Sequence, residues 1–215
     1  MRGGYDIIDV TPGFGRSRFS RREIIEIGIS VLVLSLAFTI VLTRRSWGIE
    51  GFILNFLLNY GICLALVTLS FIPHELGHKF VAQKYGAWSE YRMSGRGLLM
   101  SLAISLLGFL IAAPGAVYIN GRIDEKQNGV ISAAGPMVNI VISGVAIFLL
   151  QFVTGTWTVS LLNFLAYLNA MLAIFNLIPM PPLDGSKIVR WSVPVWIAMI
   201  AAGGLEFLFT LGMLF

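Results

Sequence analysis

Charged residues are scarce in this chain. Asp, Glu, Lys and Arg together make up 12% of it, whereas a soluble globular domain carries about a quarter. Cysteine occurs once, at Cys63, so an intrachain disulfide is excluded and we interpret this residue as a small buried hydrophobe. Histidine occurs twice, which leaves few ways to build a histidine-rich site. These scarcities exclude an ordinary soluble domain and a disulfide-stabilised one.

Long apolar runs take the place of the missing charge. Apolar residues make up 57% of the chain, and the mean hydropathy is +0.83. Several runs reach the length of about twenty residues that a helix needs to cross a bilayer. We expect spans at residues 24–43, 51–85, 129–152, 157–178 and 193–215. The predicted fold is an all-α polytopic membrane protein, with about five to six transmembrane helices in the lipid bilayer.

One apolar stretch is too short to span. Residues 98–111 are apolar, but a spanning helix needs about twenty residues. The sequence A-A-P-G-A-V-Y-I-N-G follows. We expect a loop at 85–97, then a re-entrant or interfacial segment, then a short extended segment at 115–119.

The distribution of basic residues predicts the orientation. Residues 1–22 are polar and rich in arginine, and we expect them to form a cytoplasmic arm before a single membrane domain at 23–215. If 98–120 makes no net crossing, every Lys and Arg except Arg44 and Arg45 lies on the cytoplasmic side. If residues 98–120 cross the membrane once, more of the Lys and Arg residues lie on the outer side. The first arrangement obeys the positive-inside bias better, and it explains the net charge of +4 without nucleic acid as a partner.

The two histidines lie in the motif H-E-L-G-H. His74 and His78 are four residues apart, so a helix places them on one face, where both imidazoles can reach one metal ion. Glu75 stands beside the first histidine, in the position of a general base that acts on water. The alternative is a helix that carries two histidines by chance. An ionisable trio beside a membrane-length apolar run favours the functional interpretation.

A catalytic zinc site usually takes three protein ligands plus water. No histidine is left for the third ligand, so a carboxylate is expected. The acidic residues within or beside apolar runs are Glu23, Glu26, Glu50, Asp184 and Glu206. We interpret Glu206, in the middle of the last span, as an intramembrane hydrogen-bond partner that is protonated or paired.

Asp184 lies in the segment N-L-I-P-M-P-P-L-D-G, where three prolines interrupt the helix. Irregular backbone at membrane depth is tolerated where it is buried in protein or lines a water-filled cavity. The carboxylate of Asp184 is therefore expected to point into a cavity. A surface turn that joins two spans is the alternative.

Together these motifs resemble the site-2 protease family of intramembrane zinc metalloproteases. H-E-L-G-H is followed by A-G-P-x-x-N and then by N-x-x-P-x-P-P-L-D-G, and the similarity covers about residues 57–190. One departure is Pro73 directly before the first histidine, which we expect to kink the helix there.

The resemblance implies a site and a function. His74, His78 and Asp184 correspond to the ligands of one zinc ion per chain, and Glu75 corresponds to the catalytic carboxylate. The resemblance also assigns substrate-binding or site-orienting positions, which are Asn139, Asn176, Gly115 and Val117. The last two lie in a segment similar to the family's membrane-embedded β-loop. The implied function is regulated intramembrane proteolysis of transmembrane protein substrates, with the catalytic core at about 51–190. The absence of a targeting segment fits a prokaryotic cell membrane.

Three other functions compete with this one. A metal-dependent polytopic transporter or channel also uses intramembrane carboxylates, but it does not need the acid at Glu75. Another helical H-E-x-x-H membrane protease would take a glutamate in E-x-x-x-D spacing, which has no counterpart here. An inactive membrane scaffold would not need the complete set of expected catalytic residues. The oligomeric state does not follow from the sequence.

Overall fold

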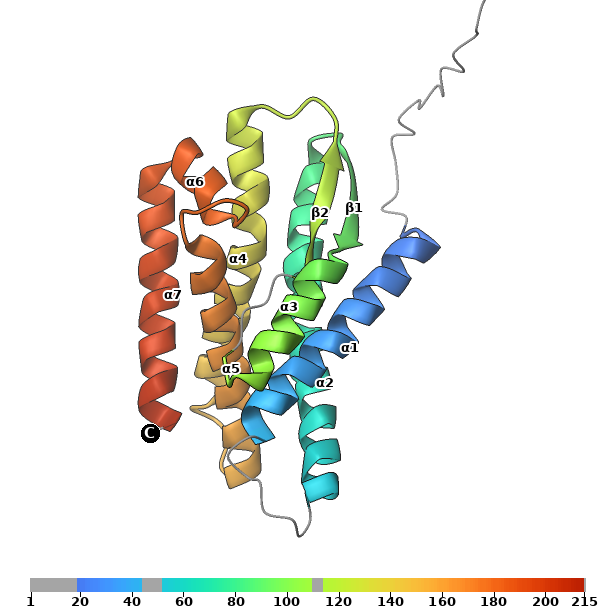
Figure 1. The fold of residues 1–215 in the computed structure, drawn as a ribbon. Helices are drawn as coiled ribbons and strands as arrows, with labels where there is room; N and C mark the ends of the chain where they lie inside the picture. Colours follow the sequence, from blue (N-terminus) through green and yellow to red (C-terminus); the bar gives the residue numbers. More distant parts are fainter. Residues whose placement is uncertain (1–18, 44–51, 110–113, 215) are drawn as a thin grey trace, which may run out of the picture.

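The computed structural model describes residues 19–43, 52–109 and 114–214 (Figure 1), so most of the predicted N-terminal arm lies outside the described residues. The helices are α1 (Arg21–Thr43), α2 (Phe52–Lys84), α3 (Gly95–Leu106), α4 (Glu125–Leu149), α5 (Thr156–Leu177), α6 (Gly185–Trp191) and α7 (Val193–Leu214), and the strands are β1 (Trp88–Met93) and β2 (Gly115–Asn120).

Five of the described helices, α1, α2, α4, α5 and α7, are long and apolar enough to cross a membrane. A helix can do so because it satisfies its own backbone hydrogen bonds where no water is available. The predicted all-α polytopic fold is therefore confirmed, and each predicted span overlaps one of these helices.

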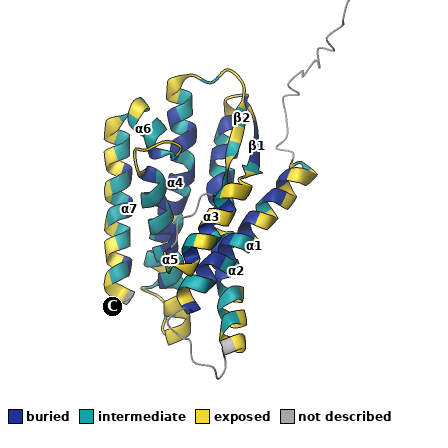
Figure 2. Ribbon diagram, in the orientation of Figure 1, coloured by how far each residue is buried: buried dark blue, intermediate teal, exposed yellow. Residues whose placement is uncertain are grey.

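The five long helices pack side by side in the order α1, α2, α4, α5 and α7 (Figure 1). Buried residues face the interior of the bundle, whereas α7 carries a row of exposed residues along its length (Figure 2). That row includes Leu205 and Leu208, which are 70% and 65% exposed. Exposed leucine side chains on a spanning helix are the expected contact with lipid tails.

Two helices begin at side-chain caps. The backbone N–H of Gln127 donates to Oδ1 of Asp124 at 2.7 Å, and the backbone N–H of Asp124 donates to Oε1 of Gln127 at 3.1 Å. This capping box satisfies free donors at the start of α4. The backbone N–H of Gly97 donates to Oγ of Ser94 at 3.1 Å, which starts α3 directly after β1.

A two-stranded antiparallel sheet lies at one end of the bundle. It pairs β1 with β2, from Trp88 opposite Asn120 to Met93 opposite Gly115. The extended segment predicted at 115–119 is confirmed. The loop predicted at 85–97 is wrong, because residues 88–93 form β1 and α3 begins at Gly95. The strand W-S-E-Y-R-M has no apolar alternation, so its extended form depends on pairing with β2.

The chain from the end of α2 to the start of α4 begins and ends at the same end of the bundle (Figure 1). It therefore makes no net crossing, as the distribution of basic residues predicts. Helix α3 spans 12 residues, too few to cross a bilayer. The short helix α6, which sequence reasoning did not predict, lies at the same end as the sheet (Figure 1).

Candidate metal centre

Helix α2 carries the two histidines on one face. Their side chains are buried, and their Nε2 atoms lie 3.1 Å apart. The helix continues through Pro73, so the kink expected there stays a prediction. Glu75, which is 8% exposed, has no hydrogen-bond partner for its carboxylate within the described part of the chain. An acid without a partner beside two paired imidazoles is available for proton transfer.

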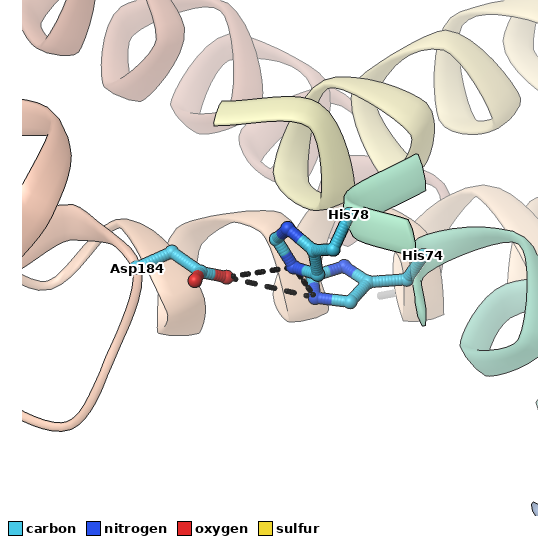
Figure 3. Close-up of side chains that lie close together, drawn as sticks. All are labelled: His74, His78 and Asp184. Carbon is cyan, nitrogen blue, oxygen red and sulfur yellow. Dashed lines mark hydrogen bonds and ion pairs between the residues drawn. The ribbon is translucent and has the colours of Figure 1, made fainter. Parts of the chain in front are cut away.

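Asp184 reaches the histidines from the other half of the chain. Its Oδ2 lies 3.7 Å from Nε2 of His74 and 3.2 Å from Nε2 of His78 (Figure 3). Asp184 stands directly before α6. A Cβ atom at Gly185 would lie 2.1 Å from the carbonyl oxygen of Leu177. Glycine therefore lets the start of α6 pack against the end of α5, and this contact places Asp184.

The three ligand atoms fit a zinc ion. Zinc bonds of about 2.0–2.1 Å at tetrahedral angles hold two ligand atoms about 3.3 Å apart. The three separations here are 3.1, 3.2 and 3.7 Å. Among the described residues, His74, His78 and Asp184 form the one group of histidine, cysteine and acidic side chains that could hold a metal ion. Asp184, from the segment that the prolines interrupt, therefore meets both imidazoles, and its carboxylate lines a cavity as expected.

Hydrogen bonds behind the imidazoles determine their tautomers. Asn139 Nδ2 donates to the carbonyl oxygen of Ser70 at 3.1 Å and to Oδ1 of Asn169 at 2.8 Å. The Asn139 Oδ1 atom therefore accepts from Nδ1–H of His74, at 2.6 Å. His78 donates its Nδ1–H to the carbonyl oxygen of Ile131 at 2.8 Å.

In neutral imidazoles with both Nδ1 atoms protonated, each Nε2 atom carries a lone pair. The two lone pairs and the Asp184 carboxylate converge on one point without a proton between them. Such a set repels itself unless a cation lies at its centre, and imidazole with carboxylate is a donor set that zinc accepts. The residues present therefore fit a zinc ion.

Gly135 makes room for the imidazoles. A Cβ atom at this position would lie 2.2 Å from Nε2 of His78 and 2.7 Å from Nε2 of His74. Helix α4 can therefore approach the histidines only with glycine here. The residue belongs to the motif A-G-P-x-x-N, but the sequence offers no sign that the glycine faces a metal centre.

The three asparagines near the centre have different positions. Asn139 is fully buried behind His74 and accepts a hydrogen bond from its imidazole. Asn176 lines the cavity in front of the site, and its Nδ2 donates to the carbonyl oxygen of Leu172 at 2.9 Å. Sequence reasoning missed Asn169, which is fully buried and donates to Oγ of Ser70 at 2.8 Å. An asparagine inside an apolar helix was the available signal.

Among the described residues, Glu23, Glu26 and Glu206 do not belong to the group that could hold a metal ion. Glu50 falls outside the described residues. Glu206 lies against α4, where a Cβ atom at Gly144 would be 3.0 Å from its Oε1. Its Oε2 atom is buried without a hydrogen-bond partner among the described residues, so its interpretation as an intramembrane hydrogen-bond partner stays a prediction.

A cavity of about 170 Å³ lies in front of the three ligands. Glu75 lines it together with the strand β2, through Gly115, Val117 and Ile119. Asp184 and Lys187 also line it, and Lys187 Nζ lies 3.8 Å from Oδ1 of Asp184. The Oδ2 atom of Asp184 faces the Nε2 atoms of both imidazoles, so the carboxylate is placed to bind a metal together with them.

Comparisons with known proteins point to one family of peptidases. The family model of peptidase family M50 matches residues 152–202. A putative zinc metalloprotease of Methanocaldococcus jannaschii is 39% identical over 182 residues, which cover 83% of this chain and 89% of that protein. No solved structure matches the chain.

More distant relatives carry similar names. Another zinc metalloprotease of Methanocaldococcus jannaschii is 30% identical over 78% of this chain and 43% of its own length. The putative zinc metalloprotease YwhC of Bacillus subtilis is 32% identical over 60% of this chain and 67% of its own length. The match is thus broadest for the first relative, which the chain covers almost completely.

Proposed function

Because the chain belongs to peptidase family M50, the site-2 protease family, and is a zinc metalloprotease of the membrane, we propose that His74, His78 and Asp184 hold its zinc ion. We also propose Glu75 as the catalytic carboxylate. The observation that carries both proposals is the convergence of three ligand atoms at zinc spacing beside an acid without a partner. The protease domain is residues 23–215, with its catalytic core at about 51–190.

The reaction is hydrolysis of a peptide bond. Zinc, when bound, lowers the pKa of water to about 7 and polarises a carbonyl group. Glu75 accepts a proton from the attacking water and later donates it to the leaving amine. The cavity that Glu75 lines has room for water, since about 30 Å³ suffices for one molecule and the cavity volume is about 170 Å³.

The substrate is a transmembrane segment of another membrane protein, cut within or near the bilayer as in regulated intramembrane proteolysis. A helical substrate shields its carbonyl groups, so it has to unwind locally before cleavage. Strand β2 lines the cavity beside Glu75, and an extended peptide can pair with a free strand edge through its backbone. We propose that the unwound substrate adds to β2 along Gly115 and Val117.

The orientation follows from the basic residues. The sheet, α6 and the first turn of α1 lie at one end of the bundle (Figure 1). Lys84, Arg92, Arg122 and Lys187 belong to the chain at this end. By the positive-inside bias, we expect this basic end of the bundle on the cytoplasmic side of a prokaryotic cell membrane. A reporter fused after the C-terminal helix would test this, because α7 ends at the opposite end of the bundle and the reporter should be extracytoplasmic.

One comparison tests the enzymatic proposal. The full chain and its Glu75→Gln variant are purified in detergent, analysed for zinc, and incubated with a transmembrane model substrate. We expect one zinc per chain in both proteins and cleavage by the unaltered chain alone, because the amide of the substituted glutamine cannot accept a proton from water. Equal activity of the two proteins would favour a transporter or another role for the metal, and no cleavage by either would favour a scaffold.

A further inference from the structure

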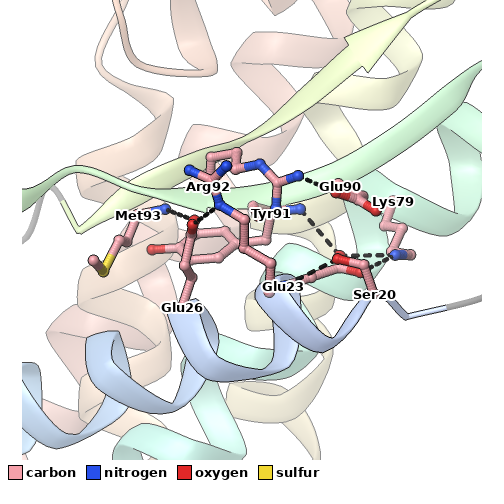
Figure 4. Close-up of polar contacts among 9 residues, drawn as sticks. Ser20, Glu23, Glu26, Lys79, Glu90, Tyr91, Arg92 and Met93 are labelled. Atoms are coloured by element: carbon pink, nitrogen blue, oxygen red, sulfur yellow. Dashed lines mark hydrogen bonds and ion pairs between the residues drawn. The ribbon is translucent and has the colours of Figure 1, made fainter.

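Two carboxylates of α1 close the outer edge of β1. The backbone N–H of Tyr91 donates to Oε1 of Glu23 at 3.0 Å, and the backbone N–H of Met93 donates to Oε2 of Glu26 at 2.9 Å (Figure 4). The glutamates lie three residues apart on α1, so they share one face of the helix. Another peptide therefore cannot pair with β1 at these positions.

Ser30 extends this contact along the same face of α1. Its Oγ lies 2.9 Å from the hydroxyl of Tyr91, and both side chains are buried. Helix α1 thus holds β1 at Glu23, Glu26 and Ser30, one helical face against one strand. We call this set of contacts the α1–β1 clamp.

The clamp is joined to the helix that carries the histidines. Lys79, the residue after His78, donates from Nζ to both carboxylate oxygens of Glu23, at 2.7 and 2.5 Å (Figure 4). Its carbonyl oxygen accepts from Oγ of Ser89 in β1 at 3.1 Å. Glu23 is fully buried and Lys79 is 1% exposed. The position of the sheet is therefore set against the turn of α2 that bears His78.

A buried ion pair is a poor way to gain stability. Removing two charges from water costs several kcal/mol, and well-packed apolar residues often serve as well or better. The extra hydrogen bond from Tyr91 offsets part of that cost. A pair of this kind instead imposes one geometry, because its charges are satisfied only when α1, α2 and β1 meet in this arrangement.

The pairing of the strands shows which groups of β2 remain free. In an antiparallel pair, hydrogen-bonded residue pairs alternate with pairs that exchange no bonds. The backbone N–H of Ser94 donates to the carbonyl oxygen of Pro114 at 2.7 Å, so the next pair, Met93 with Gly115, exchanges none. The outward N–H groups of Tyr91 and Met93 in the clamp agree with this alternation.

The same alternation runs along β2. Tyr91 lies opposite Val117, and Ser89 lies opposite Ile119. The backbone N–H and C=O groups of Gly115, Val117 and Ile119 therefore point away from β1. All three residues line the cavity with His74 and Glu75. The free edge of the sheet thus belongs to β2 and runs beside the metal centre.

We propose that Glu23 and Glu26 are positioning residues that determine which peptide bond of the substrate is cleaved, an inference that rests on the proposed docking of substrate on β2. They close the edge of β1 and hold β2 in one register against the turn of His78. When a clamp contact is lost, the sheet can shift, and the substrate strand is presented to Glu75 in more than one register. Slips of two residues are expected, because a slip of one would turn every side chain to the opposite face.

The test compares Glu26→Leu with Glu26→Gln in the full chain, with zinc bound, on one transmembrane model substrate. Leucine removes the acceptor for the Met93 N–H, whereas glutamine keeps an acceptor oxygen. Cleaved bonds are mapped by mass spectrometry, and zinc content, kcat and KM are measured. For the leucine variant we expect cleavage at additional bonds two residues away, with zinc content unchanged. We expect KM to rise about tenfold with kcat within about twofold. Loss of a hydrogen bond to a charged group, worth at least that factor, lowers the population in which β2 can dock substrate, and the apparent affinity falls by that fraction. The glutamine variant should cut the original bond.

Met93→Pro removes the same contact from the other side. Proline deletes the donor that meets Glu26 but no bond between the strands, because Met93 and Gly115 exchange none. It should reproduce the Glu26→Leu pattern, and the double variant should add little. Ser35→Ala serves as a control, because Ser35 Oγ donates only within α1, to the carbonyl oxygen of Val31 at 2.7 Å.

Two outcomes would overturn the inference. One is that Glu26→Leu and Met93→Pro both retain zinc, cut only the original bond and keep an unchanged KM. The other is loss of zinc from Glu26→Leu and Met93→Pro, which would show that the contact between Glu26 and Met93 maintains the fold rather than the register of the substrate strand. Failure of the proposed function gives a different result, namely no cleavage by the unaltered chain or cleavage by Glu75→Gln.

Discussion

Asn139 of α4 accepts a hydrogen bond from His74 of α2 at 2.6 Å, across 65 positions of the chain. The bond fixes the imidazole so that its Nε2 lone pair faces His78 and Asp184. Asn139 is held in turn by Asn169 and by the backbone of Ser70. The proposed zinc ligand His74 is thus oriented by a network that contributes no ligand of its own.

Replacing Asn139 with alanine should weaken zinc binding. Loss of the group that orients a ligating histidine typically lowers metal affinity by about 10–100-fold. Competition with a chromophoric chelator measures this affinity. Asn176→Ala is the matched control, because Asn176 lines the cavity but makes its hydrogen bond to Leu172, and its zinc affinity should stay unchanged. Equal affinities of all three proteins would contradict the proposed role of Asn139.

Gly135→Ala should abolish or strongly reduce zinc binding. The added methyl group would lie 2.2 Å from Nε2 of His78, well inside contact distance, and the backbone of α4 limits how far it can retreat. Zinc content after purification is the measurement. Gly203→Ala is the control, since its Cβ atom would meet its nearest neighbour at 3.6 Å. Full zinc occupancy in Gly135→Ala would show that α4 does not pack on the histidines as described.

Removing zinc should lower the thermal stability of the protein. Without the cation, two lone pairs and a carboxylate face one another at 3.1–3.7 Å. A ligand that binds only the folded state at 100 times its Kd adds about 2.7 kcal/mol. Tm is followed in detergent during chelation and on return of zinc. Asp184→Ala should lose most of this zinc-dependent shift, and an identical shift in that variant would exclude Asp184 as a ligand.

Proline in β2 should separate substrate docking from metal binding. Val117→Pro and Ile119→Pro delete donors on the free edge, and proline is tolerated on edge strands where its nitrogen faces outward. We expect cleavage to fall at least about tenfold, since each deletes a backbone hydrogen bond to the substrate, while zinc content stays the same. Tyr118→Pro instead deletes a bond between β1 and β2 and should disturb the sheet itself. Unchanged cleavage in the first two variants would refute docking on β2.

Local patterns in the sequence were sufficient for the helices and for the outline of the site. A span is a property of contiguous apolar residues, so the helices at 21–43 and 125–149 could be recognised without knowledge of their neighbours. The four-residue spacing of His74 and His78 guarantees a common face on any helix. The prolines before Asp184 require an interrupted backbone wherever the segment lies.

Only the tertiary structure decided what depends on two distant segments. Strand β1 has a polar sequence and becomes a strand because β2 and the carboxylates of α1 satisfy its backbone. Gly135 matters because α4 places it against the histidines, and Asn169 matters because α5 places it against Asn139. The local sequence does not reveal either neighbour. The contacts of Glu23 and Glu26 with β1 also depend on two distant segments. The sequence shows two carboxylates near the start of a helix, but only the packing of β1 against α1 identifies the backbone N–H groups that they accept from.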